Sequence, residues 1–114
     1  MTLLETITRA CDDLKALDIQ ILDMQKISPL VDYMVICTGR SDRQVNAIVR
    51  KIKDEVLKNN FKVKHIEGAD ANLWVLIDCF DIVCHVFMND ERIKYSIEKI
   101  WGDVPRVNAE TLLK

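Results

Sequence analysis

The apolar segment at residues 33–37, Tyr-Met-Val-Ile-Cys, restricts the fold more than any other part of the chain. Its unbroken run of apolar, largely β-branched residues is typical of an interior strand covered on both faces. Ser41 then offers a helix N-cap, and Gln44 completes a capping box. Apolar residues recur at helical spacing from Val45 to Val56, so a helix is expected to about Lys58. The sequence therefore predicts a buried strand followed directly by an amphipathic helix.

Helices and strands are also predicted on both sides of this unit. Residues 2–17 form an amphipathic pattern, with Thr2 as N-cap and Glu5 three residues on, and residues 18–24 form a strand pattern. Further strands are expected over 61–66, 73–77 and 82–87, and a last helix over 89–100, capped by Asn89 or Asp90, with Ile93, Ile97 and Ile100 facing the core. The predicted order is α-β-β-α-β-β-β-α, an α/β domain whose mixed sheet of about five strands is covered by helices.

Chain length and hydropathy limit the molecule to one domain. The 114 residues, 49% of them hydrophobic, suffice for a single core. We expect one domain over residues 1–107 and a C-terminal tail over 108–114. The longest apolar runs have only four or five residues, so no membrane span is predicted. Because no secretory signal is visible, we expect a cytoplasmic protein.

Four cysteines, Cys11, Cys37, Cys79 and Cys84, are scattered without any C-x-x-C pair. Each lies in or beside an apolar pattern, which favours small buried thiols in a reducing compartment. Metal sites usually contain close ligand pairs, which this sequence lacks. We therefore predict no metal and no cofactor.

Charge is distributed unevenly along the chain. Residues 40–64 contain eight Lys or Arg against three acids, a net charge of +5. Residues 65–91 contain six acids and no Lys or Arg, a net charge of −6. The second segment suits a basic partner such as a ribosomal protein. Local accumulation of acids in turns and at helix starts is the alternative explanation.

Candidate functional residues surround the hairpin predicted at residues 78–81. Asp78 and Asp81 could hold a divalent metal, but their i, i+3 spacing does not ensure that the carboxylates converge. His85 lies in a predicted strand, where a half-buried structural residue is expected more often than a catalytic base. Trp74 is either an interface anchor or a core residue, and Tyr95 lies at the edge of the last helix. No catalytic set emerges from these residues.

Several blocks, in this order along the chain, resemble the ribosomal silencing factor family, also called the Iojap-related family. The similarity extends over residues 3–107. It is carried by D-I-Q-I-L-D at 18–23, D-Y-M-V-I-C-T-G-R-S-D-R-Q-V at 32–45, E-G at 67–68, W-V-L-I-D at 74–78, D-I-V-C-H-V-F at 81–87, R-x-x-Y at 92–95 and E-K-I-W-G-D at 98–103.

The resemblance implies a nucleotidyltransferase-like fold without a working active site. It implies binding to the fourteenth protein of the large ribosomal subunit, which prevents the small subunit from joining and represses translation when nutrients are scarce. It also implies homodimers, and no sequence-specific binding of nucleic acid is expected. The residues that we expect to bind the partner are Glu67, Asp70, Trp74, Asp78, Phe80, Asp81, His85 and Tyr95.

Two positions depart from the family pattern. Phe80 stands in the hairpin where the family usually has Gly, which puts the tight turn in question and suggests an exposed ring. Met88, Asn89 and Asp90 replace a His-Pro-Glu sequence. A metal-dependent nucleotidyl- or phosphoryl-transfer enzyme using Asp78 and Asp81 is the alternative function. That enzyme would need both carboxylates to converge near residues 39–41.

Overall fold

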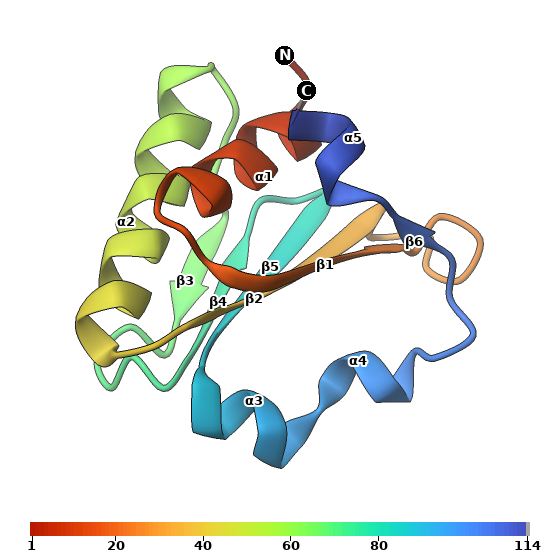
Figure 1. The fold of residues 1–114 in the computed structure, drawn as a ribbon. Coiled ribbons are helices and arrows are strands. Elements are labelled where there is room, and N and C mark those ends of the chain that lie inside the picture. The colour runs from red at the N-terminus through yellow and green to blue at the C-terminus, as the bar shows by residue number, and fades with distance from the viewer. Residues whose placement is uncertain (114) are drawn as a thin grey trace.

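One mixed six-stranded sheet organises the molecule (Figure 1), which we describe over residues 1–113 of a computed structural model. The strand order is β3-β4-β5-β2-β1-β6, with a parallel β2–β5 pair at the centre and antiparallel pairs elsewhere. The predicted mixed sheet is confirmed, with one strand more than expected. The strands are β1 (Leu17–Asp23), β2 (Tyr33–Gly39), β3 (His65–Glu67), β4 (Trp74–Asp78), β5 (Ile82–Met88) and β6 (Arg106–Val107).

Two long helices, α1 (Leu3–Asp13) and α2 (Asp42–Lys58), cover one face of the sheet (Figure 1). The capping box predicted between Thr2 and Glu5 is present at the start of α1. Ser41 caps α2 as predicted, because its hydroxyl accepts a hydrogen bond from the Gln44 amide. The second half of that predicted box is wrong. The Gln44 Oε1 instead accepts from the Arg40 amide at 2.6 Å, one residue earlier than in a capping box.

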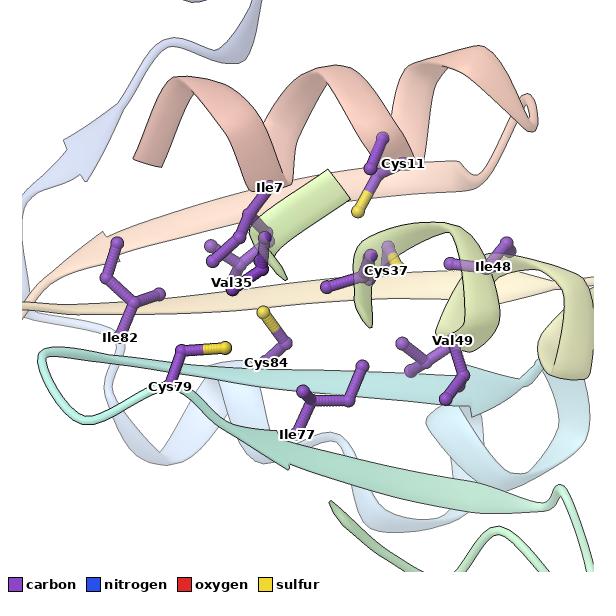
Figure 2. Close-up of a cluster of buried hydrophobic side chains, with 14 of the residues drawn as sticks. Ile7, Cys11, Val35, Cys37, Ile48, Val49, Ile77, Cys79, Ile82 and Cys84 are labelled. Carbon is purple, nitrogen blue, oxygen red and sulfur yellow. The ribbon is translucent and has the colours of Figure 1, made fainter. Parts of the chain in front are cut away.

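The main core lies between these helices and the sheet, and all four cysteines belong to it (Figure 2). Cys11 comes from α1, while Cys37 and Cys84 come from the central strands. The prediction of buried free thiols is confirmed. Burial raises the pKa of the Cys79 thiol to about 11, with a further contribution from the Asp78 carboxylate. The Cys79 thiol therefore stays protonated at neutral pH and acts as a small apolar group.

Gly39 lets β2 pass closely under the start of α2. A Cβ atom at this position would lie 2.8 Å from Val45 Cγ2 and 3.0 Å from the Val45 backbone nitrogen. Any larger residue would force the helix away from the strand. Gly39 thus fixes the strand-to-helix junction that the sequence predicted.

The last predicted helix is wrong in its continuity and in two of its three core-facing isoleucines, whereas Ile97 packs against the core as predicted. It is divided into α3 (Asn89–Tyr95) and α4 (Ile97–Ile100) at Ser96, which has a φ of +45°. The N-cap is Met88, without a side-chain cap. Arg92 is the residue of α3 that is buried, whereas Ile93 and Ile100 are 69% and 71% exposed.

Arg92 explains why this segment does not follow the isoleucine pattern. Its guanidinium donates to Thr38 Oγ1 at 2.8 Å and to the Asp18 carbonyl oxygen, and it forms ion pairs with the Asp18 and Glu98 carboxylates. These charged contacts reach from α3 to the bulged start of β1. They turn Arg92 inward, which carries the neighbouring Ile93 toward solvent.

Two further segments differ from the prediction. The strand expected over 61–66 forms later, as β3 at residues 65–67, since the Phe61 amide still donates to the Val56 carbonyl at the end of α2. Near the C-terminus, β6 pairs with β1, and α5 (Ala109–Leu113) packs against α1. The domain boundary expected after residue 107 stays a prediction. Among the described residues no helix is long and apolar enough to cross a membrane.

Candidate protein-binding face

The sheet face opposite α1 and α2 is only partly covered. The small helices α3 and α4 and the segment around Val104 pack on it over β1, β2 and the end of β5. Beyond them, side chains of β3, β4 and β5 reach solvent. We call this region the open sheet face, and it consists of His65, Glu67, Trp74, Leu76, Asp78 and Val83.

Trp74 sits at one end of this face in a cluster of rings. Its ring stacks on that of Phe87, with centroids 4.7 Å apart, and contacts that of Tyr95 at 4.9 Å. Its indole Nε1 donates to His85 Nδ1 at 3.0 Å. Because the Trp74 side chain is only half-buried, part of it remains available to a partner while the rest is held in place.

His85 holds the Trp74 ring in place by accepting its hydrogen bond, and it is more buried than expected. It is 7% exposed, and this burial lowers its pKa to about 4 from the usual 6.5. The imidazole is therefore neutral at physiological pH. With Nδ1 accepting from Trp74, its proton is assigned to Nε2. This arrangement makes His85 an uncharged support of the tryptophan.

Gly68 directly follows β3, begins the loop at residues 68–72, and lies against the start of β4. It has a φ of +85°, and a Cβ atom there would lie 2.3 Å from the Trp74 carbonyl oxygen. Both features require glycine. The loop, which carries the exposed Asp70, thereby passes directly against the backbone of Trp74.

The hairpin at residues 78–81 closes at the other end of the open sheet face. The Asp78 Oδ1 accepts from the Phe80 amide at 2.9 Å, so the carboxylate itself stabilises the turn. Phe80 adopts the left-handed conformation, with a φ of +71°, and its ring is 49% exposed. The turn therefore forms despite the missing glycine. It does so in a conformation that costs a residue with a Cβ roughly 1–2 kcal/mol.

The predicted binding residues fall into two groups rather than one. Trp74, His85 and Tyr95 meet at one end, while Asp78, Phe80 and Asp81 lie at the other, four strand residues or about 13 Å away. Two acids stand apart from these groups. Glu67 lies opposite Leu76, with its carboxylate 3.1 Å from His65 Nε2, and Asp70 lies on the neighbouring loop.

Leu30 is part of this surface, although sequence reasoning missed it. The side chain is 81% exposed and lines, with Val31, Lys64 and the hairpin residues, a hollow of about 370 Å³. The sequence could have indicated this exposure, because Leu30 is an apolar residue in a turn segment outside any predicted helix or strand. Leu30 and Phe80 together add exposed apolar area beside Asp78 and Asp81.

The metal-dependent transferase alternative lacks the arrangement that it requires. Asp78 and Asp81 adjoin the start of β5, where Tyr33 pairs with Ile82, whereas Gly39 pairs with Met88 at the other end of the same strands. Six residues of strand separate the two ends, about 20 Å. Within residues 1–113 no group of three or more His, Cys, Asp or Glu could hold a metal ion.

Comparisons with known proteins agree with this geometry. The family model described as "Ribosomal silencing factor during starvation" matches residues 1–114. A ribosomal silencing factor of Bacillus subtilis is 51% identical over 109 residues, which cover 96% of this chain and 92% of that protein. The chain belongs to the ribosomal silencing factor family. The role of this family is regulatory.

Two further relatives extend the comparison to structure and to organelles. A crystal structure from Bacillus halodurans superposes with a TM-score of 0.83 at 40% identity, covering 93% of this chain and 96% of that one. The mouse protein named "Mitochondrial assembly of ribosomal large subunit protein 1" is 31% identical in an alignment of 107 positions that covers 85% of this chain and 46% of that protein. The α/β fold with a mixed sheet is thus shared by solved members of the family.

Proposed function

We propose that this protein binds the large ribosomal subunit through its fourteenth protein, prevents the small subunit from joining, and so represses translation when nutrients are scarce. Family membership supports a ribosome-associated silencing role. The name of the mouse relative supports an association with the large subunit. The observation that carries the proposal is the open sheet face, where a held but accessible Trp74 lies among carboxylates on an otherwise covered sheet.

The open sheet face has the composition of a protein-binding surface. Trp74 and Tyr95 supply aromatic contact area whose geometry is fixed before binding, which lowers the entropic cost of association. Phe80 and Leu30 supply a second apolar contact at the hairpin. Aromatic residues of this kind are frequent among the residues that dominate binding energy.

Acidic residues surround these anchors and select a basic partner. Glu67, Asp70, Asp78 and Asp81 lie in a segment without Lys or Arg. Charges at the rim of an interface mainly accelerate association and exclude wrong partners. We therefore assign the aromatic groups to affinity and the carboxylates to the choice of a basic ribosomal protein.

Steric exclusion suffices for the proposed inhibition. The molecule measures 33 × 32 × 28 Å. A body of this size on the intersubunit face occupies the space in which two subunits would contact each other. Catalysis is therefore not required. A cytoplasmic location, a homodimeric state and a nucleotidyltransferase-like ancestry of the fold belong to the same proposal.

Co-sedimentation with purified ribosomal subunits tests this function. We expect the protein to pellet with large and not with small subunits, and to reduce the formation of joined ribosomes. Equal pelleting with both subunits, or with neither, would contradict the proposal. Binding should also weaken as salt is raised, because rim charges are screened over about 8–10 Å.

A matched pair of charge variants tests the assigned face. Asp78→Asn with Asp81→Asn should weaken binding to large subunits. Asp12→Asn with Asp54→Asn removes two exposed acids from the opposite side and should not. Detection of Mg²⁺-dependent nucleotide transfer that the first variant abolishes would instead favour the transferase alternative.

A further inference from the structure

The outer side of α2 and the link after it carry a dense group of unpaired bases. Within residues 1–113, only one of the eight bases between positions 40 and 64 forms an ion pair: Lys51, with Asp13 and Glu55. The other seven are exposed and form none. We call six of them the basic α2 surface: Arg40, Arg43, Arg50, Lys53, Lys58 and Lys62. The seventh, Lys64, lies beside the hairpin at residues 78–81.

The helix holds part of this surface rigidly. Its inner stripe, from Val45 to Val56, is buried against the sheet, so the remaining positions must face outward. Arg43 and Arg50 are seven residues apart, which places them on the same side, two turns or about 10 Å apart. Lys53 follows one turn later. Fixed cations at this spacing form a row along one side of the helix.

We propose that the basic α2 surface binds the phosphate backbone of ribosomal RNA, independently of its sequence, while the open sheet face holds the protein partner. This proposal rests on the proposed function, because a ribosomal subunit is a particle of RNA and protein. It adds a second contact of opposite charge on the opposite side of the sheet (Figure 1).

The chemistry of the surface favours RNA over an acidic protein. Protein interfaces depend on a few desolvated aromatic or aliphatic anchors, and the described exposed side of α2 contains only Leu57 of this kind. Phosphate backbones instead require Lys and Arg, with Asn or Gln between them. Asn46 lies next to this row, and Asn60 is exposed at the end of the helix.

The uneven distribution of charge allows this protein to approach RNA although its net charge is negative. The whole chain has a net charge of −2, which by itself disfavours approach to a polyanion. Residues 65–91 carry a local net charge of −6, whereas residues 40–64, which include α2, carry a local net charge of +5. The local field, more than the net charge, steers association.

Salt dependence of binding to purified large subunits tests the proposal. Arg50→Gln with Lys53→Gln removes two bases from the basic α2 surface. Lys26→Gln with Lys99→Gln removes two exposed bases elsewhere, so both variants reach the same net charge. For the first, we expect the slope of log K against log salt to become shallower by about 1.5, with binding roughly tenfold weaker at 0.1 M salt. The control should keep the wild-type slope.

A photo-crosslinking residue placed at Lys53 identifies the partner. Crosslinks to ribosomal RNA in the bound complex would support the proposal, and crosslinks only to a ribosomal protein would overturn it. An unchanged slope in the Arg50 and Lys53 variant would also overturn it. These failures are distinct from failure of the proposed function, in which the wild-type protein would not bind large subunits.

Discussion

The two faces of the central sheet are formed by the same strands but differ in how fully other elements cover them. On the face under α1 and α2, Val75, Ile77 and Val86 are completely buried among aliphatic side chains and thiols. On the other face, their neighbours Trp74, Leu76 and Asp78 remain partly exposed. The alternation of a strand therefore separates residues that hold the fold from residues available for recognition.

The helices on each face explain this difference. Helix α2 has 17 residues and five buried apolar side chains, whereas α3 and α4 have seven and four residues and no buried apolar side chain. Short helices with a single buried arginine cannot cover a whole sheet. The uncovered area is the open sheet face, which is the surface that we propose binds the partner.

The largest expected effect compares two adjacent residues of β4. Ile77→Ala removes a side chain that is completely buried under α2 and should lower the free energy of unfolding by about 4 kcal/mol. Leu76→Ala, on the open sheet face, should cost about 1–2 kcal/mol because that residue is only half-buried. Urea denaturation of both variants measures the difference. Equal losses would show that the two faces contribute alike to stability.

The next prediction concerns the pH dependence of stability through His85. Its pKa is about 4 in the folded protein against a usual 6.5, so the unfolded chain binds the proton more readily between these values. The stabilisation is complete above pH 6.5 and is lost as the pH falls toward 4, by on the order of 3 kcal/mol.

His85→Asn serves as the reference for this measurement, because its amide oxygen can still accept from Trp74 but does not titrate. The wild-type protein should lose more stability than this variant between pH 7 and pH 4 in urea titrations. Parallel pH profiles would mean that His85 is not a neutral, buried support.

A smaller effect is expected from Trp74 on binding. Trp74→Ala should weaken binding to large subunits by about 30-fold, or roughly 2 kcal/mol, if it is an interface anchor. Trp101→Ala is the control. Trp101, like Trp74, packs against a small buried cluster on this side of the sheet, but it lies outside the proposed site. That cluster consists of Leu22, Met24, Ile36, Phe87 and Val104. Melting curves and binding titrations on both variants separate loss of fold from loss of contact. Normal binding by a folded Trp74→Ala protein would remove this residue from the site.

The smallest effect tests the hairpin at Phe80. Phe80→Gly and Phe80→Ala both remove the exposed ring, but only glycine relieves the positive φ. We therefore expect the glycine variant to be more stable than the alanine variant by about 1 kcal/mol in thermal or chemical unfolding. Both should bind large subunits more weakly than the wild type if the ring contacts the partner.

Regular periodicity made most of the fold predictable from sequence. The strand at 33–39 and the helix at 42–58 were anticipated because apolar spacing, cap and glycine all indicate the same structure. The region after residue 88 was not, because Arg92 binds Asp18 and Thr38, residues more than fifty positions away. Local patterns contain no information about such a contact.

The candidate site was predictable only in part for a similar reason. Alternation along β4 correctly put Trp74 and Val75 on different faces of the sheet. The predicted hairpin correctly put Asp78 and Asp81 on either side of one turn. The contact between Trp74 and Tyr95 depends on how α3, which ends just before Ser96, packs against β5. The exposure of Leu30 depends on the conformation of a turn. These features come from tertiary structure and leave no periodic signal.

The parallel pairing of β2 with β5 has a consequence for how the chain folds. Tyr33 pairs with Ile82, so the centre of the sheet forms only after about fifty intervening residues have been brought together. Such long-range contacts require costly loop closure and are typical of slowly folding proteins. The rings of Trp74, His85 and Phe87 belong to the local β4–β5 hairpin, which needs no such long-range closure. This hairpin joins the rest of the sheet only when β5 pairs with β2.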